Sequence, residues 1–290
     1  MNIEKFSSFF QGEALRFLEE AIELALREDG RDLTSEGVFP PDHRLGAKII
    51  AKEDTLVAGL PIIPLVMERC GHGEWSWKAF VHDGDLVADR TVVATIEADA
   101  ARLLKAERII LNFITHMSGI ANLTRRYVQA LSGTGTRLLD TRKTLPCLRY
   151  PEKYAVLVGG GLNHRKNLEE MLMLKDNHVD LAGGITPAVS KLRATYSPCP
   201  PIEVECRTLS EVQEAVLCKV ERIMLDNMDT AQMCEALELI PESIETEVSG
   251  GVTLETIHAL ASASTKGPDF ISVGRLTHSA PVADFSMLVQ

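Results

Sequence analysis

Positively charged side chains gather in one segment of this chain, although the chain as a whole carries a formal net charge of −11. From Arg142 to Lys175 the sequence holds seven Lys or Arg against three Glu, a local balance of +4. Gly159-Gly160-Gly161 and His164 lie in the middle of this segment. Cations that are buried together repel one another unless an anion offsets their charge. The segment therefore predicts a pocket for a small anion.

The cations of this segment suit different parts of an anionic ligand. Arg142 favours bidentate recognition of carboxylate or phosphate, and Lys143 favours a point contact. His164-Arg165 follows the glycine run, where a tight turn would expose polar side chains, although such a pair alone is more often a surface feature. Lys175 ends the apolar run 171–174, which favours a lysine in a site over one in solvent.

Two carboxylates are expected at the ends of neighbouring strands. Glu205 and Asp226 could hold Mg²⁺ together with substrate phosphates, accept hydrogen bonds from sugar hydroxyls, or pair with nearby lysines. Glu203 and Glu205 alternate along one strand, so they share a face and Glu203 lies deeper. The residues alone leave these roles open.

Glycine sites follow the last two expected strands. Ser249-Gly250-Gly251 and Val273-Gly274 stand where barrel proteins often bind phosphate through backbone N–H groups. One such site fits a tight turn equally well. Two sites on adjacent strands favour phosphate binding.

The second half of the chain alternates between apolar strands and helical segments, which predicts a parallel α/β barrel. Each expected strand ends in a charged, hydroxyl or glycine group, as the catalytic edge of a barrel would. The expected strands are 137–140, 202–206, 222–226, 244–248 and 270–273, with helices at 210–218, 229–239 and 253–262.

The first half of the chain predicts helices and a mostly antiparallel sheet over residues 28–97. Apolar residues at helical spacing indicate a helix at 13–27, and a longer helix is expected at 100–131 with a break near Gly119. The expected strands are 47–51, 55–58, 75–81 and 86–96, separated by turn residues.

Composition excludes several classes of function. A chain of 290 residues suits one barrel or two domains. It holds no apolar run of about 18 residues that could span a membrane, and its acidity argues against nucleic-acid binding. Six scattered cysteines without C-x-x-C spacing, and an N-terminus unlike a secretory signal, predict a reduced protein of the cytoplasm.

Two kinds of chemistry suit these residues. One is an enzyme of a phosphorylated sugar whose basic pocket holds a second, carboxylate-bearing substrate. The other is a Schiff-base aldolase with Lys175 or Lys143 as nucleophile. The aldolase needs one desolvated lysine and little other positive charge, so the number of cations favours the first.

The chain closely resembles the quinolinate phosphoribosyltransferases, the carboxylating nicotinate-nucleotide pyrophosphorylases. The matching motifs stand in family order and cover most of residues 28–285. They are 106–112 (AERIILN), 118–121 (SGIA), 140–144 (DTRKT), 152–156 (EKYAV), 159–165 (GGGLNHR), 175–178 (KDNH), 203–205 (EVE), 225–227 (LDN), 249–251 (SGG) and 272–278 (SVGRLTH).

The resemblance implies an α/β fold in two domains. Residues 1–112 would form an open-faced α/β sandwich, and residues 113–278 an incomplete, seven-stranded α/β barrel. The C-terminal tail, about 279–290, would pack back on the sandwich. The resemblance also implies a homodimer, and a hexamer stays possible.

The reaction implied is transfer of phosphoribosyl from 5-phosphoribosyl 1-pyrophosphate to quinolinate, with decarboxylation and with Mg²⁺, giving nicotinate mononucleotide for NAD biosynthesis. The implied residues fall into three groups. Quinolinate would be held by Arg142, His164, Arg165, Lys175 and, from the partner subunit, Arg108. The donor, its ribose and the metal would be served by Lys143, Glu205 and Asp226. The 5′-phosphate would be held by Ser249, Gly250, Gly251, Val273, Gly274 and His278.

The chain departs from the family pattern at a few positions. Leu145 and Cys147 replace the usual threonine and glycine, which bears on the loop that follows Lys143. Cys206 and Arg207 differ from the usual neighbours of Glu205. Two alternatives remain: a related transferase that accepts another pyridine or base, and a non-enzymatic relative.

Overall fold

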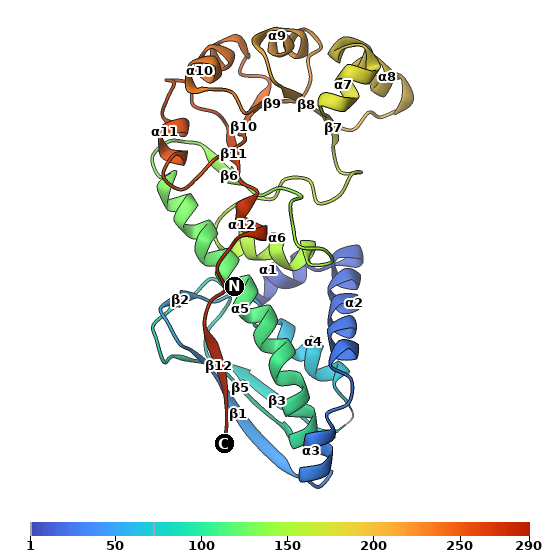
Figure 1. The fold of residues 1–290 in the computed structure, drawn as a ribbon, viewed down its shortest axis with the longest axis vertical. Coiled ribbons are helices and arrows are strands. Elements are labelled where there is room, and N and C mark those ends of the chain that lie inside the picture. Colours follow the sequence, from blue (N-terminus) through green and yellow to red (C-terminus); the bar gives the residue numbers. More distant parts are fainter. Residues whose placement is uncertain (1, 72) are drawn as a thin grey trace. The chain divides into compact units, whose positions relative to one another are not determined.

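A computed structural model describes residues 2–71 and 73–290 (Figure 1). The chain forms two compact units. The first, here the sandwich unit, comprises residues up to Arg125, Lys143–Gly160 and Arg275–Gln290. The second, the barrel unit, comprises Arg126–Arg142 and Gly161–Gly274. The boundary predicted at residue 112 lies within a helix, and it stays a prediction.

An antiparallel sheet of order β12-β1-β5-β3 forms the centre of the sandwich unit. Its strands are β1 (Arg44–Ala51), β3 (Ser76–Ala79), β5 (Val92–Asp99) and β12 (Phe285–Val289), and β2 (Thr55–Leu56) pairs separately with β4 (Leu86–Val87). The predicted antiparallel sheet is confirmed. The single strand expected at 86–96 is wrong, because Thr91 N–H donates to the Ala88 carbonyl in a turn where Arg90 has a φ of 65°.

The helices of the sandwich unit are α1 (Asn2–Phe9), α2 (Gly12–Asp29), α3 (Leu33–Val38), α4 (Ile62–Arg69), most of α5 (Ala100–Ala130), α6 (Arg149–Val158) and α12 (Arg275–His278). The predicted helix at 13–27 is confirmed by α2, whose buried residues Ala14, Leu18, Ile22 and Leu26 recur at helical spacing. The break expected near Gly119 is wrong, because α5 runs through it. A Cβ at Gly119 would lie 2.0 Å from the Pro281 carbonyl oxygen, so this glycine permits close packing.

A parallel sheet of order β6-β11-β10-β9-β8-β7 builds the barrel unit, which confirms the predicted α/β class. Its strands are β6 (Arg137–Leu139), β7 (Leu172–Leu174), β8 (Ile202–Cys206), β9 (Arg222–Asp226), β10 (Glu245–Ser249) and β11 (Phe270–Ser272). A parallel bridge between Leu139 and Leu162 adds a seventh, single-residue position.

Helices cover the outside of this curved sheet, as Figure 1 shows. They are α7 (Asp176–Ala182), α8 (Ile185–Thr195), α9 (Leu209–Leu217), α10 (Thr230–Leu239) and α11 (Ile257–Ala261). Across the described part of the chain, no helix is long and apolar enough to cross a membrane.

The two faces of the barrel sheet differ in chemistry because side chains alternate along each strand. The paired residues Val204, Ile223 and Leu225 on one face are buried and apolar. The other face carries Glu203, which pairs in register with Arg222. This second, charged face positions the candidate site.

Candidate active site

The carboxyl ends of the parallel strands bring the predicted chemical groups of the barrel unit to one edge. Glu205 lies near the end of β8, Asp226 ends β9, and Ser249 ends β10. The registers pair Asp226 with Ser249 and Glu205 with Met224, so Asp226 and Ser249 stand level at the edge and Glu205 lies two residues deeper. Glu205, Asp226 and Ser249 are all half-buried, which leaves them within reach of a ligand.

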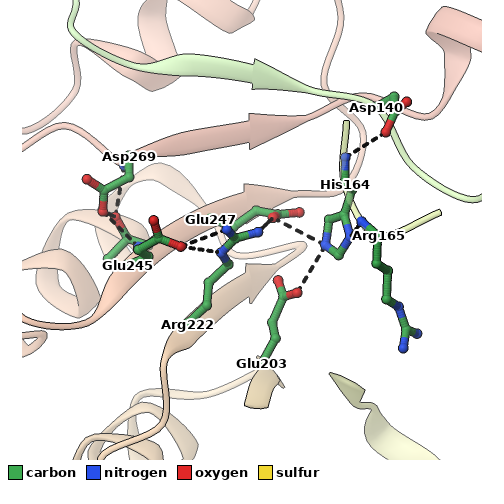
Figure 2. A network of polar contacts seen from close by, with 9 residues as sticks. Asp140, His164, Arg165, Glu203, Arg222, Glu245, Glu247 and Asp269 are labelled. Atoms are coloured by element: carbon green, nitrogen blue, oxygen red, sulfur yellow. Dashed lines mark hydrogen bonds and ion pairs between the residues drawn. The ribbon is translucent and has the colours of Figure 1, made fainter. Parts of the chain in front are cut away.

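Asp140, which follows β6, ties the loop before Arg165 to the sheet. Its carboxylate is fully buried and accepts the His164 N–H and the Asn163 side-chain amide, each at 2.8 Å (Figure 2). Hydrogen bonds to a buried carboxylate are strong because its charge is otherwise unsolvated. Asp140 thus fixes the backbone position of His164, and with it the start of the Arg165 side chain.

His164 uses both ring nitrogens within the protein. Its Nδ1 accepts the Arg165 N–H at 2.7 Å, and its Nε2 lies 3.0 Å from Glu203 Oε2 and 3.5 Å from Glu247 Oε2. An Nδ1 that accepts has no proton, so a neutral His164 carries its proton on Nε2, the nitrogen that faces the two carboxylates. The contact of His164 with substrate stays a prediction.

Glu203 and Glu247 form a buried acidic pair beneath the edge of the sheet (Figure 2). Burial raises the pKa of Glu203 to about 7, against the opposing effect of Arg222 and Arg165. Burial and then repulsion from Glu203 raise the pKa of Glu247 to about 8. The position of Glu203, on the same face as Glu205 and deeper, is as predicted.

Arg222 supports this pair from below. Its Nη2 lies 2.6 Å from Glu245 Oε2, and its Nη1 lies 3.5 Å from Glu247 Oε2. The guanidinium also stands over the Phe270 ring at 4.5 Å, and Arg137 stands over the same ring at 4.2 Å. Cation–π contacts of this kind hold charged groups in place at low cost in desolvation.

Arg165 and Arg142 form the cationic part of the site. Arg165 Nη1 donates to the Met171 carbonyl at 2.8 Å, which fixes one end of the guanidinium. Burial, and then repulsion from Arg142, lower the pKa of Arg165, whereas Glu203 acts in the opposite direction. Two half-buried guanidinium groups close enough to repel one another are suited to an anionic ligand.

The glycines after β10 allow two loops to pack closely. Asn227, with a φ of 53°, donates its N–H to the Ser249 carbonyl at 2.9 Å and its side-chain amide to Asp226 at 2.8 Å. Gly250 has a φ of 103°, and a Cβ there would lie 2.2 Å from Asn227 Oδ1. Only glycine therefore fits at residue 250, and the contact also orients the Asp226 carboxylate.

The remaining predicted residues divide between the units. In the barrel unit, Lys175 is exposed at the start of α7, where its N–H donates to His178 Nδ1 at 3.1 Å. Val273 is buried, and the half-buried Gly274 that follows it is the last residue of the barrel unit. Arg108, Lys143 and His278 are exposed residues of the sandwich unit.

Two sets of acidic residues in the barrel unit offer ligand atoms for a metal ion. One is the buried cluster of His164, Glu203 and Glu247, whose ligand atoms lie within 4.8 Å of one another, with Arg222 Nη1 3.5 Å from Glu247 Oε2. Glu205 and Asp226 offer carboxylate oxygens at the open edge, which fits a hard cation that also binds substrate oxygens.

The sequence reasoning missed Glu247 and Arg222. Both lie on the inward face of their strands, within runs that alternate charged and apolar residues. The pattern Glu-x-Glu at 245–247 repeats that at 203–205, and this repeat could have indicated a second strand with two glutamates on one face.

Comparison with known proteins places the whole chain. Residues 32–118 match the model of the quinolinate phosphoribosyl transferase N-terminal domain, and residues 120–288 match that of the C-terminal domain. A protein of Synechocystis named as a probable nicotinate-nucleotide pyrophosphorylase (carboxylating) is 43% identical over 250 residues, 85% of this chain and 83% of that protein.

Two solved structures agree. NadC from Streptococcus pyogenes has a TM-score of 0.88 at 37% identity, covering 94% of this chain and 96% of that chain. The nicotinate-nucleotide pyrophosphorylase from Francisella tularensis has a TM-score of 0.89 at 32% identity, covering 97% and 99%. Sequence and fold thus agree over both units, and the chain belongs to the quinolinate phosphoribosyltransferase family.

Proposed function

We propose that this chain transfers the phosphoribosyl group of 5-phosphoribosyl 1-pyrophosphate to quinolinate, giving nicotinate mononucleotide, pyrophosphate and carbon dioxide. Family membership supports this activity. The observation that carries it is the pair Arg142 and Arg165, which are close enough to repel. A ligand with two carboxylates would offset both charges.

Quinolinate would be bound by the cations of the barrel unit. Arg142 and Arg165 would each receive a carboxylate in bidentate fashion, and Lys175 would add a point charge. His164 would either contact the ligand or hold the Arg165 backbone through its Nδ1. These roles share one requirement, that the ring nitrogen of quinolinate face the donor sugar.

The donor would be bound at the carboxyl edge of the sheet. Backbone N–H groups of 249–251, with Val273, Gly274 and His278, would hold the 5′-phosphate. The close packing of Gly250 on Asn227 supports this role, because it leaves the loop free of side-chain bulk. Glu205 and Asp226 would face the ribose, and Lys143 would contact the pyrophosphate.

Mg²⁺ fits the donor set of this edge. Glu205 and Asp226 would hold it together with oxygens of the donor, and Asn227 keeps Asp226 in place. When bound, the ion would neutralise charge that develops on pyrophosphate as it leaves.

The transfer itself requires no protein nucleophile, because the pyridine nitrogen of quinolinate attacks the sugar. As the bond to pyrophosphate breaks, the sugar carbon gains oxocarbenium character, which the carboxylates of Glu205 and Asp226 would stabilise. Once the nitrogen is alkylated, its positive charge stabilises the electron pair left at the neighbouring carbon when carbon dioxide departs. That carbon then takes a proton. The protein contributes mainly position and electrostatics.

A homodimer would complete the site. Arg108 lies with Arg31 and Lys105 around a surface hollow of about 360 Å³ in the sandwich unit, lined by Asp29, Gly30, Arg31, Asp32, Leu33, Thr34, Leu104, Lys105 and Arg108. We propose that this surface brings Arg108 to the quinolinate of a partner subunit. Light scattering that shows an active monomer would contradict this proposal, whereas a dimer or a hexamer agrees with it.

The cytoplasm is the proposed location. All six cysteines are free in the structure, and Cys147 is exposed. Free, exposed thiols are typical of proteins in a reducing compartment.

The decisive experiment supplies purified protein with quinolinate, phosphoribosyl pyrophosphate and Mg²⁺, and measures nicotinate mononucleotide. Turnover is expected. A protein that is inactive with quinolinate but active with nicotinate would be a transferase for another pyridine. A folded protein without turnover at any tested metal or pH would exclude the activity.

A further inference from the structure

The loop that begins with Lys143 is held at three successive residues. The Thr277 hydroxyl donates to the Lys143 carbonyl at 2.8 Å, and Arg149 Nε donates to the Thr144 hydroxyl at 3.4 Å. The Leu145 N–H donates to Glu152 Oε2 at 3.2 Å. All of these residues belong to the sandwich unit. The chain is therefore held at the Lys143 carbonyl and at the two residues that follow it.

Glu152 provides the deepest of these anchors. It is fully buried on α6, and it belongs to the motif 152–156 (EKYAV), which the proposed mechanism does not use. While Oε2 accepts from Leu145, Oε1 lies 2.9 Å from His116 Nε2 on α5. A buried carboxylate is costly unless its oxygens are hydrogen-bonded, so each of these contacts favours the other.

We propose that Glu152, oriented by His116, is a positioning residue that holds the Lys143 backbone so that its ammonium reaches the donor pyrophosphate. This inference rests on the proposed function, which assigns Lys143 to the donor. Leu145 lies only two residues from Lys143, so release of its N–H would let the lysine shift with the loop. A shift of about 1 Å in a positioned group can cost about a hundredfold in rate.

Kinetics of Glu152→Ala test the proposal. We expect kcat/KM for phosphoribosyl pyrophosphate to fall by about tenfold to a hundredfold. Glu152→Gln should recover part of the loss, because the amide oxygen can still accept the Leu145 N–H. The matched control is Tyr154→Phe on the same helix, where Tyr154 donates to Asp83 at 2.9 Å and its ring packs against Phe6 and Phe10. It should lower Tm and leave the kinetics within about twofold.

A double-mutant cycle separates positioning from general damage. In a Lys143→Ala background, Glu152→Ala should lower kcat/KM by less than about threefold, because the lysine that it positions is gone. An equal loss in both backgrounds would show that Glu152 acts only through stability. A kinetic loss in Tyr154→Phe as large as in Glu152→Ala would overturn the proposal in the same way.

A measurement that does not depend on enzymatic turnover distinguishes this inference from the proposed function. Hydrogen exchange at the amides of 143–145, 147 and 148 should accelerate by about tenfold in Glu152→Ala and stay unchanged in Tyr154→Phe. If Glu152→Ala does not fold, Thr277→Val removes another anchor of the same loop without changing side-chain size, and it should accelerate exchange there too. Unchanged exchange refutes the anchoring. Wild-type protein that is inactive with quinolinate but shows this exchange pattern refutes only the proposed function.

Discussion

The charge of Glu247 should make the stability of the barrel unit depend on pH. Burial and repulsion from Glu203 raise its pKa from 4.5 to about 8. The folded state therefore binds this proton more tightly than the unfolded chain does. The resulting stabilisation is complete below the unfolded pKa of 4.5 and is lost as pH rises through the folded value of about 8.

The size of this effect follows from the two pKa values. Between about pH 5.5 and about pH 8.5, the titration of Glu247 alone should lower the free energy of unfolding by about 3 kcal/mol. Glu203 titrates in the same direction, because burial raises its pKa to about 7. Glu247→Gln keeps the size of the side chain and removes its charge. We expect the loss of stability across this pH range to be smaller in the variant by about 3 kcal/mol.

Urea unfolding followed by far-UV circular dichroism measures this difference. Tryptophan fluorescence does not serve here, because Trp75 and Trp77 both lie in the sandwich unit. Glu245→Gln is the matched control on the same strand. Glu245 is half-exposed and pairs with Arg222, and loss of such a pair changes stability by about 1 kcal/mol or less. If Glu247→Gln loses as much stability between the two pH values as wild type does, the reasoning is refuted.

Three further predictions concern the site and its support. Arg142→Ala and Lys143→Ala should each lower kcat/KM by about a hundredfold or more in the steady-state assay, and near-normal kinetics for both would contradict the site. Asp140→Asn should lower the free energy of unfolding by about 1–3 kcal/mol, because an amide cannot accept both donors; an unchanged urea midpoint would argue otherwise. Gly159→Ala should cost about 1–3 kcal/mol, measured by tryptophan fluorescence, because its Cβ would lie 2.6 Å from an α5 carbonyl. An unfolding midpoint equal to that of wild type would show that the backbone of α5 can move to accommodate the added methyl group.

The local pattern of the sequence predicted the barrel strands well. The strands expected at 202–206 and 222–226 have the observed bounds of β8 and β9, and the one expected at 244–248 lies within one residue of β10. These strands were predictable because one apolar face is buried against helices and because each ends at a turn. Both constraints act within a few residues.

The errors occurred where distant segments decide the outcome. Gly119 suggested a helix break, but the glycine is needed because the backbone near Pro281 approaches α5. Similarly, no property of the residues near Arg90 forces a turn there. In the structure Arg90 N–H donates to the carbonyl of Ala51 on another strand. Contacts between segments far apart in sequence cannot be read from local periodicity.

The candidate site was predictable to the same extent. Residues at or just after strand ends, such as Asp226 and Arg142, could be named as candidates because the carboxyl ends of parallel strands share an edge. Glu247 and Arg222 were missed because their pairing depends on the register between strands. The tautomer of His164 was equally hidden, since it follows from the Arg165 N–H and the depth of Glu203.

On the inner face of the barrel sheet, cationic and acidic residues alternate from the edge of the sheet downward. This arrangement explains how a cationic pocket folds without its ligand. Arg165, repelled by Arg142, gains attraction from Glu203, and Arg222 pairs with Glu247 and Glu245 below. With pKa values of about 7 and about 8, Glu203 and Glu247 carry less than two full charges near neutral pH. The acidic layer therefore offsets the cations only in part. The remaining positive charge at the edge of the sheet is what a dicarboxylate would neutralise on binding.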